Sequence, residues 1–147
     1  MLAALKHFLG RPPAERPKVD AKLAVAQLLL EMARADFSPD TAEIATIREL
    51  LGRAYALGTD DLEALLKEAG SRVDRSISLH DAVAAINSAL GPEERRTLIA
   101  MLWRVAYADG RLDKYEEALL RKLSDLLFIP HSEFIREKLA VVSDRPR

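Results

Sequence analysis

The chain has 147 residues, of which 49% are hydrophobic and 31% charged, and its formal net charge is −1. This composition is typical of one folded domain, and the absence of an apolar run of about 18 residues excludes a transmembrane helix. The near-neutral charge and the lack of a basic patch argue against nucleic-acid binding, and the absence of cysteine excludes disulfides and thiolate chemistry.

Residues 1–19 are expected to form an arm ahead of the folded domain. Within residues 1–9, Leu2, Leu5 and Phe8 fall on one side of a short amphipathic segment, and three prolines between residues 11 and 17 then prevent a helix. Two interpretations stay open: an arm that is mobile or packs loosely on the domain, or a helix that docks on a partner protein or a membrane surface. The arm lacks a signal-peptide cleavage site, and the sequence fits a cytoplasmic protein.

The domain is expected to span residues 20–142, with residues 143–147 as a tail, and to contain about seven helices. Apolar residues recur every three or four positions, and no segment alternates long enough to form a strand. Residues 24–35 and 98–108 are apolar on nearly every side, so both stretches are expected at the centre of the core. The final helix is expected to turn four residues inward: Phe134, Ile135, Leu139 and Val142.

Several residues fit the ends of these helices. Asp20 is expected to cap the first helix, and Pro92 to take the first position of its own helix. Gly58, Gly91 and Gly110 are expected to end helices in the left-handed conformation, and Thr59 to cap the helix that follows Gly58.

An acidic pattern, Ala-x-Ala-Asp-x3-Asp-x2-Glu, occurs twice with a separation of 73 residues. The first copy contains Asp36, Asp40 and Glu43, and the second contains Asp109, Asp113 and Glu116. Two copies predict a duplicated domain with two pseudo-symmetric halves, at about residues 20–75 and 92–142, joined by a helix at about residues 79–90.

The acids of the second copy allow two interpretations. In the first they only cap a helix, because Asp113 accepts a backbone N–H and Glu116 reaches back to the N–H of Asp113. Capping leaves Asp109 unexplained, since it ends a helix where the macrodipole disfavours a carboxylate. In the second interpretation the three carboxylates hold Ca²⁺ or Mg²⁺, which prefer oxygen ligands, and Asp36, Asp40 and Glu43 of the first copy are candidates for the same role. The spacing matches only half of an EF-hand loop, so a complete EF-hand is excluded.

These residues resemble the TerB-like family, named for bacterial tellurite resistance, from about Lys22 to Leu139. The stretches that carry the resemblance are Ala33–Asp36, Ile86–Asn87, Pro92–Arg95, Leu102–Gly110 and Phe134–Arg136. The resemblance implies a compact all-α domain of two pseudo-symmetric halves in a bacterial cytosolic protein linked to stress or metal-oxyanion resistance. It also implies acidic residues that bind a divalent metal. The family prefers Asp-Gly in both turns, and Phe37 follows Asp36 here, so the second-half site is favoured.

The sequence therefore predicts an all-α, non-enzymatic domain that binds a divalent cation, a protein partner or both. The alternative is a purely structural interaction domain whose acids only cap helices. A metal-dependent hydrolase is more remote, because no base or nucleophile accompanies the carboxylates. Arg104 and Glu31, which are charged residues in otherwise apolar helices and occupy equivalent positions of the two halves, are expected to form an ion pair.

Overall fold

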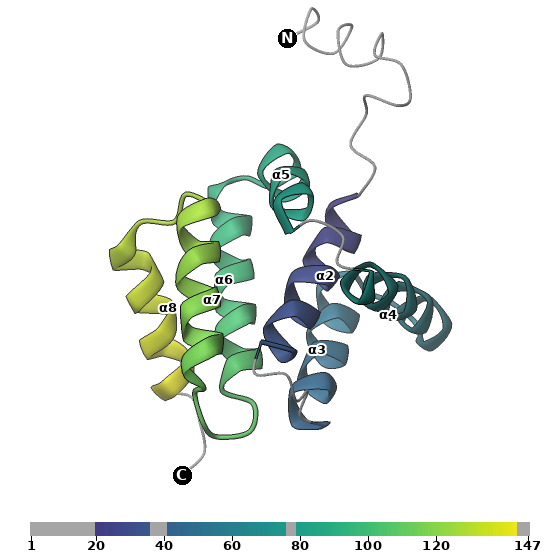
Figure 1. The fold of residues 1–147 in the computed structure, drawn as a ribbon, viewed down its shortest axis with the longest axis horizontal. Coiled ribbons are helices and arrows are strands. Elements are labelled where there is room, and N and C mark those ends of the chain that lie inside the picture. The colour runs from purple at the N-terminus through teal and green to yellow at the C-terminus, as the bar shows by residue number, and fades with distance from the viewer. Residues whose placement is uncertain (1–19, 36–40, 76–78, 144–147) are drawn as a thin grey trace, which may run out of the picture.

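The computed structural model describes residues 20–35, 41–75 and 79–143, and these residues form helices and short connections without a strand (Figure 1). The helices are α2 (Ala21–Ala33), α3 (Thr41–Ala54), α4 (Thr59–Asp74), α5 (Leu79–Ala89), α6 (Pro92–Ala106), α7 (Lys114–Leu126) and α8 (His131–Ser143). The all-α class is thereby confirmed. The predictions for residues 1–19, Asp36, Phe37, Asp40 and residues 144–147 lie outside the described residues.

Two helix starts follow the capping signals in the sequence. Asp20 is the N-cap of α2, and its side chain accepts the N–H of Leu23 at 2.8 Å. Pro92 begins α6, where Glu94 accepts the N–H of Gly91 at 3.2 Å and so completes one side of a capping box. Both predictions are confirmed, because each depends only on residues within one helical turn of the cap.

The predictions for Gly58, Gly91 and Thr59 are wrong. Gly58 and Gly91 have φ angles of −76° and −78°, and they are the N-caps of α4 and α6. Neither glycine therefore uses the left-handed conformation, and Thr59 is the first helical residue of α4 and not its cap. Both connections are so short that each glycine already belongs to the helix that follows it.

Helix α3 instead ends through an alanine in the left-handed region. Ala56 has a φ of 51°, and the N–H of Leu57 donates to the carbonyl of Gly52 at 3.0 Å, as in a Schellman motif. Phe128 takes the same position after α7, with a φ of 59°, and this residue is 73% exposed. Both positions favour glycine, since a Cβ in the left-handed region costs about 1–2 kcal/mol.

We expect Ala56→Gly to raise the free energy of unfolding by about 0.5–1 kcal/mol. The substitution removes the left-handed strain, and the greater freedom of glycine in the unfolded chain offsets part of this gain. Ala64→Gly, at an exposed position inside α4, is the matched control and should lower it by about 0.5–1 kcal/mol. Urea denaturation gives both values, and a loss of stability in Ala56→Gly would contradict the strain.

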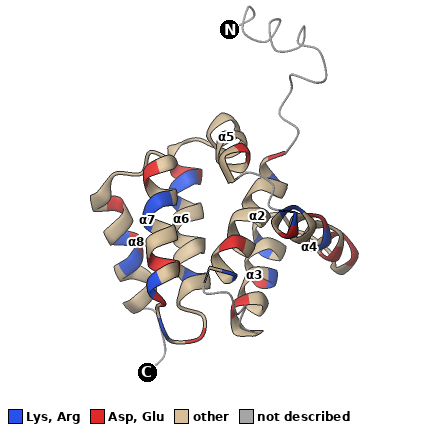
Figure 2. Ribbon diagram, in the orientation of Figure 1, with Lys and Arg blue, Asp and Glu red and all other residues tan. Residues whose placement is uncertain are grey.

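Helices α2 and α6 form the centre of the molecule, as their apolar sequences predict. Ten of the 13 residues of α2 are buried, and α2 packs against α3, α4, α5, α6 and α7. Figure 2 shows most charged residues on the surrounding helices, particularly α4, α7 and α8. Burial of this apolar surface is the main term that stabilises the fold.

The two halves lie side by side, with α2, α3 and α4 on one side of Figure 1 and α6, α7 and α8 on the other. Helix α5 lies between them in the chain and packs on α2. The halves also exchange contacts, because α3 packs on α6 and α7 packs on α2. Because α2 corresponds to α6 and α3 to α7 in the two sequence copies, these two contacts are equivalent to each other, while a two-fold rotation between the halves stays a prediction.

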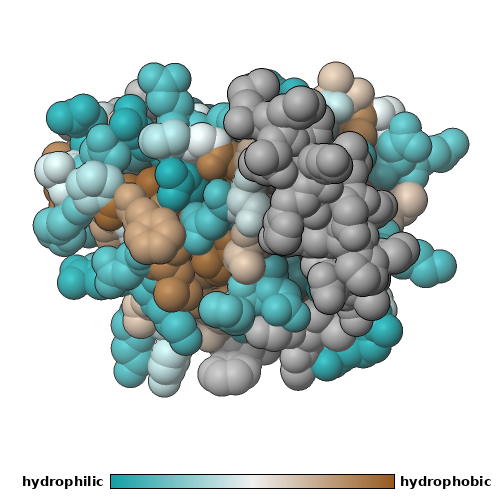
Figure 3. All heavy atoms as spheres, turned by 90° about the horizontal axis from the view of Figure 1, so that it is seen from above, coloured by the Kyte–Doolittle hydropathy of each residue, from teal (hydrophilic) through white to brown (hydrophobic). Residues whose placement is uncertain are grey.

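The predicted inward face of α8 is partly wrong. Phe134 and Val141 are buried, whereas Leu139 is 58% exposed and Val142 is also exposed. The reason is that α8 packs mainly against α6, so only a narrow stripe of the helix is covered. Apolar side chains also reach the surface among hydrophilic ones on the face seen from above (Figure 3).

The expected ion pair between Arg104 and Glu31 does not form. Arg104 is exposed on α6, and among the described residues no salt bridge joins it to Glu31. Glu31 is half-buried, and this burial raises the pKa of its carboxyl group, against the opposing effect of Arg34. A helix that is apolar on most sides still leaves a strip for one charged residue to reach water.

Because the pKa of Glu31 is raised in the folded state, ionisation of this residue opposes folding. Its favourable contribution is present below the usual glutamate pKa of about 4.3 and is lost as the pH rises through the folded pKa. We therefore expect Glu31→Gln to gain stability relative to the parent chain between about pH 4 and pH 7. Urea denaturation at several pH values measures the difference, with the exposed Glu68→Gln as the charge-matched control. If the difference in unfolding free energy between Glu31→Gln and the parent chain does not change with pH, the raised pKa of Glu31 is contradicted.

Candidate functional site

In the acidic turn between α6 and α7, two aspartate side chains accept hydrogen bonds from backbone N–H groups of the same turn. Asp109 is exposed, and its Oδ1 accepts the N–H of Arg111 at 2.9 Å, while Gly110 takes a left-handed φ of 89°. Asp113 is the N-cap of α7, and its Oδ1 accepts the N–H of Tyr115 at 2.7 Å. The capping role of Asp113 and the left-handed Gly110 are therefore confirmed.

The third acid of this turn is buried. Glu116 is 2% exposed, and its counterpart Glu43 at the start of α3 is 1% exposed. Within the described ranges, no three Asp, Glu or His side chains lie close enough together to hold one metal ion. Asp109 and Asp113 instead bond to nearby backbone, and Glu116 turns into the interior of the domain.

Two carboxylates of the turn still fit part of a cation site. The hydrogen bonds of Asp109 and Asp113 use Oδ1, and no bond to Oδ2 of either residue is found among the described residues. Mg²⁺ is commonly held by one or two carboxylates together with water, so these two oxygens are a chemically reasonable donor set. Asp36 and Asp40 of the first turn lie outside the described residues.

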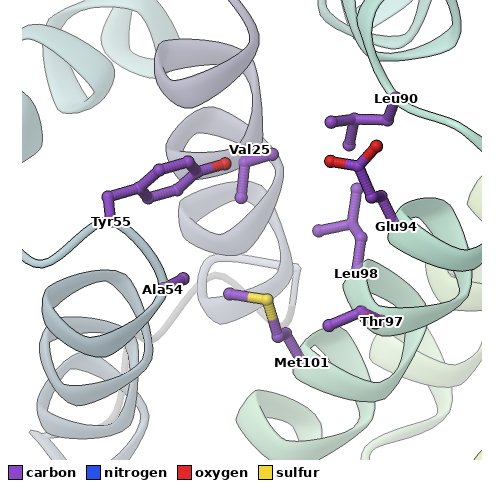
Figure 4. A pocket seen from close by; sticks show the side chains of 8 residues that line it. All are labelled: Val25, Ala54, Tyr55, Leu90, Glu94, Thr97, Leu98 and Met101. Atoms are coloured by element: carbon purple, nitrogen blue, oxygen red, sulfur yellow. The ribbon is translucent and has the colours of Figure 1, made fainter.

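A second candidate is a hollow of about 180 Å³ between α2, the end of α3 and residues 94–101 of α6 (Figure 4). Most of the residues that line it are apolar or present methyl groups. They are Val25, Ala54, Tyr55, Leu90, Glu94, Thr97, Leu98 and Met101. The hollow is smaller than most small-molecule sites, which are about 300–1,000 Å³, and its size suits one or two side chains of a larger partner.

Tyr55 and Glu94 bring a hydroxyl and a carboxylate to the hollow from opposite sides (Figure 4). Burial raises the pKa of the Tyr55 hydroxyl, and the negative charges of Asp20 and Glu94 add to this rise. Tyr55 therefore stays a neutral donor at physiological pH. Glu94 is fixed through the bond that it accepts from the N–H of Gly91. The hollow can accordingly recognise an apolar side chain that is followed by a cationic one.

The hollow could not be predicted from the sequence, for a physical reason. Tyr55 follows the last helical residue of α3, where no helical period applies, and Glu94 resembles any acid in the first turn of a helix. The hollow forms only when α2, α3 and α6 pack together. Periodicity describes each helix separately, so it cannot place these two residues opposite one another.

The family model described as "Tellurite resistance protein TerB" matches residues 22–139, which is most of the chain. The chain belongs to the TerB family. A protein of unknown function, PG1108 from Porphyromonas gingivalis W83, has a crystal structure that is similar to this chain with a TM-score of 0.61, and the two sequences are 26% identical. This match covers 82% of the present chain and 94% of the other. No match was found among the curated proteins.

Some residues that carried the resemblance have clear structural roles in this TerB domain. The Nδ2 of Asn87 donates to the carbonyl of Leu126 at 3.0 Å, and the Nη1 of Arg95 donates to the carbonyl of Leu127 at 2.9 Å. Both carbonyls lie at the C-terminal end of α7, where the helix leaves acceptors unsatisfied and the dipole favours a cation. The two side chains thus anchor α7 to α5 and α6.

None of the helices described in this TerB domain combines the length and the apolar character needed to cross a membrane. The acidic turn and the hollow are separate features of the domain. The turn follows the C-terminal end of α6, and the hollow lies against residues 94–101 of that helix.

Proposed function

We propose that this TerB domain is a non-enzymatic, cytoplasmic module that binds an amphipathic helix of a partner protein in the hollow. The observation that carries the proposal is the mostly apolar lining, to which Tyr55 adds a neutral hydroxyl and Glu94 a carboxylate, while the hydroxyl of Thr97 donates to the carbonyl of Glu93. Amphipathic helices bind such grooves through apolar anchors spaced three or four residues apart. A lysine or arginine beside the anchor would pair with Glu94 at the rim.

A peptide titration tests this function directly. The probe is a synthetic amphipathic helix of leucine and lysine, added to the ¹⁵N-labelled full chain at physiological salt, where long-range attraction is screened. We expect the amide signals of Val25, Tyr55 and Met101 to shift. Glu94→Gln should weaken binding by about five- to tenfold, since a charge-assisted pair becomes a neutral one.

Glu93→Gln is the matched control, because it removes the same charge one residue away and outside the lining of the hollow. It should change the affinity by less than about twofold if the contact with Glu94 is direct. Glutamine preserves the capping role of Glu94, so a difference between the variants would report on binding. Equal effects of the two variants, or shifts that avoid the hollow, would contradict the proposal.

A second candidate function is the binding of Mg²⁺ or Ca²⁺ at the acidic turn. The exposed carboxylate of Asp109 favours it, because this group lies at the C-terminal end of α6 against the helix dipole. Asp113 would supply a second oxygen, and Glu116 would join only if its side chain turned outward from the interior.

Neither site has the chemistry to hold tellurite itself. Tellurite is an oxyanion, and both the acidic turn and the rim of the hollow present carboxylates that repel anions. A role of this domain in tellurite resistance or stress would therefore depend on the partner protein or the cation that it binds. We propose it in that indirect form.

A further inference from the structure

We propose that the N-terminal segment of the chain itself, residues 2–9, occupies the hollow when no partner is bound. This inference rests on the proposed function, because it names the regulation of the same hollow. The segment would dock as an amphipathic helix and compete with the helix of the partner.

The arm joins the domain beside the hollow. Residues 1–19 lead into Asp20, the N-cap of α2, and the charge of Asp20 acts on the hydroxyl of Tyr55 in the hollow. Val25, which lines the hollow, lies five residues further along α2, or about 7.5 Å at 1.5 Å per residue. The arm therefore starts close to the site that it would fill.

The linker between the segment and the domain is long enough for the chain to return. Residues 10–19 can span at most about 33–36 Å when extended, which exceeds the short path from Asp20 to the hollow. Its three prolines disfavour a helix that would carry residues 2–9 straight away from the domain. Covalent attachment also raises the effective concentration of the segment at the hollow.

The chemistry of the segment complements that of the hollow. Leu2, Leu5 and Phe8 supply apolar side chains at helical spacing for a lining such as Leu98 and Met101. Residues 1–14 include Lys6 and Arg11 but no acid, while the charged residue that lines the hollow is Glu94. A helix of eight residues is marginal alone in water, so an apolar surface would favour its formation.

Paramagnetic relaxation tests the proposal in the full chain. The chain has no cysteine, so Ala3→Cys provides one site for a nitroxide label on the face of the segment opposite Leu5. We expect the label to reduce the amide signals of Val25, Tyr55, Leu98 and Met101 strongly, and those of Lys138 and Ala140 on α8 very little. Intact signals around the hollow would overturn the proposal.

Two arm variants and a mixing experiment sharpen the result. Phe8→Ser in the labelled chain should restore the signals around the hollow, whereas His7→Ser, on the other face of the segment, should not. Equal behaviour of these variants would overturn the proposal. A mixture of labelled chains without ¹⁵N and unlabelled chains with ¹⁵N should show no loss. A loss there would place the segment on a second copy and overturn docking within one chain.

The same variants separate this inference from the proposed function. If the segment blocks the hollow, Phe8→Ser should raise the affinity for the leucine–lysine peptide severalfold, because the competing segment is weakened. A peptide that binds equally well to the parent chain and to Phe8→Ser would refute the inference and leave the proposed function intact. A peptide that fails to bind even Phe8→Ser would refute the proposed function, whatever the position of the label.

Discussion

Trp103→Ala should lower the free energy of unfolding by about 3–5 kcal/mol, the largest effect expected of a single substitution in this domain. Trp103 is fully buried in α6, and its Nε1 donates to the carbonyl of Phe134 in α8 at 3.2 Å. The rings of these two residues pack with their centroids 4.9 Å apart. Alanine would remove the ring, leave a cavity and deprive the buried carbonyl of Phe134 of the hydrogen bond from Trp103.

Urea denaturation followed by circular dichroism measures this loss, since the chain contains only one tryptophan and its fluorescence would disappear with it. Trp103→Phe keeps a ring but removes the indole N–H, so it should cost less than Trp103→Ala. Leu139→Ala, at an exposed position of α8, should stay within about 0.5 kcal/mol of the parent chain. Similar losses in Trp103→Ala and Leu139→Ala would show that α8 is not anchored through Trp103.

The helices and several of their ends follow from local sequence signals. Asp20, Pro92, Gly110 and Asp113 act where their residue types predict, because a cap or a left-handed exit depends on a few neighbouring residues. Gly58 misled the prediction for the end of α3, since that end depends on packing. Helix α3 stops two residues before Ala56, which accepts the left-handed strain although a glycine is near.

Side-chain direction was harder to predict for apolar helices and for the acidic turn. Arg104 interrupts an apolar stretch, yet it lies on the strip of α6 that faces water, and a nearly uniform pattern does not mark that strip. From the spacing of the acids, Glu116 was likewise predicted to share one metal site with Asp109 and Asp113. In the fold, Glu116 belongs to the buried side of α7, while the two aspartates bond to their own turn.

The metal hypothesis predicts a second large effect, which separates a ligand from a cap. Asp109→Asn should leave the metal-free chain as stable as the parent or a few tenths of a kcal/mol more stable, because it removes a charge opposed to the dipole of α6. Asparagine can still accept the N–H of Arg111, so the turn should persist. In Mg²⁺ or Ca²⁺, the variant should lack the stabilisation that binding gives the parent chain. That stabilisation is about 2.7 kcal/mol at a metal concentration one hundred times the dissociation constant.

Asp113→Ala provides the contrast, because its side chain caps α7 whether or not a metal is present. It should lose about 1 kcal/mol in chelator, and a further part in metal if Asp113 is also a ligand. Thermal melts of the three chains, in chelator and in millimolar Mg²⁺ or Ca²⁺, distinguish these outcomes. If metal raises the melting temperature of the parent chain but not that of Asp109→Asn, the acidic turn binds the cation. If metal changes the melting temperature of none of the three chains, Asp109 is no ligand for either ion. The two aspartates of this turn then act only as acceptors of backbone hydrogen bonds.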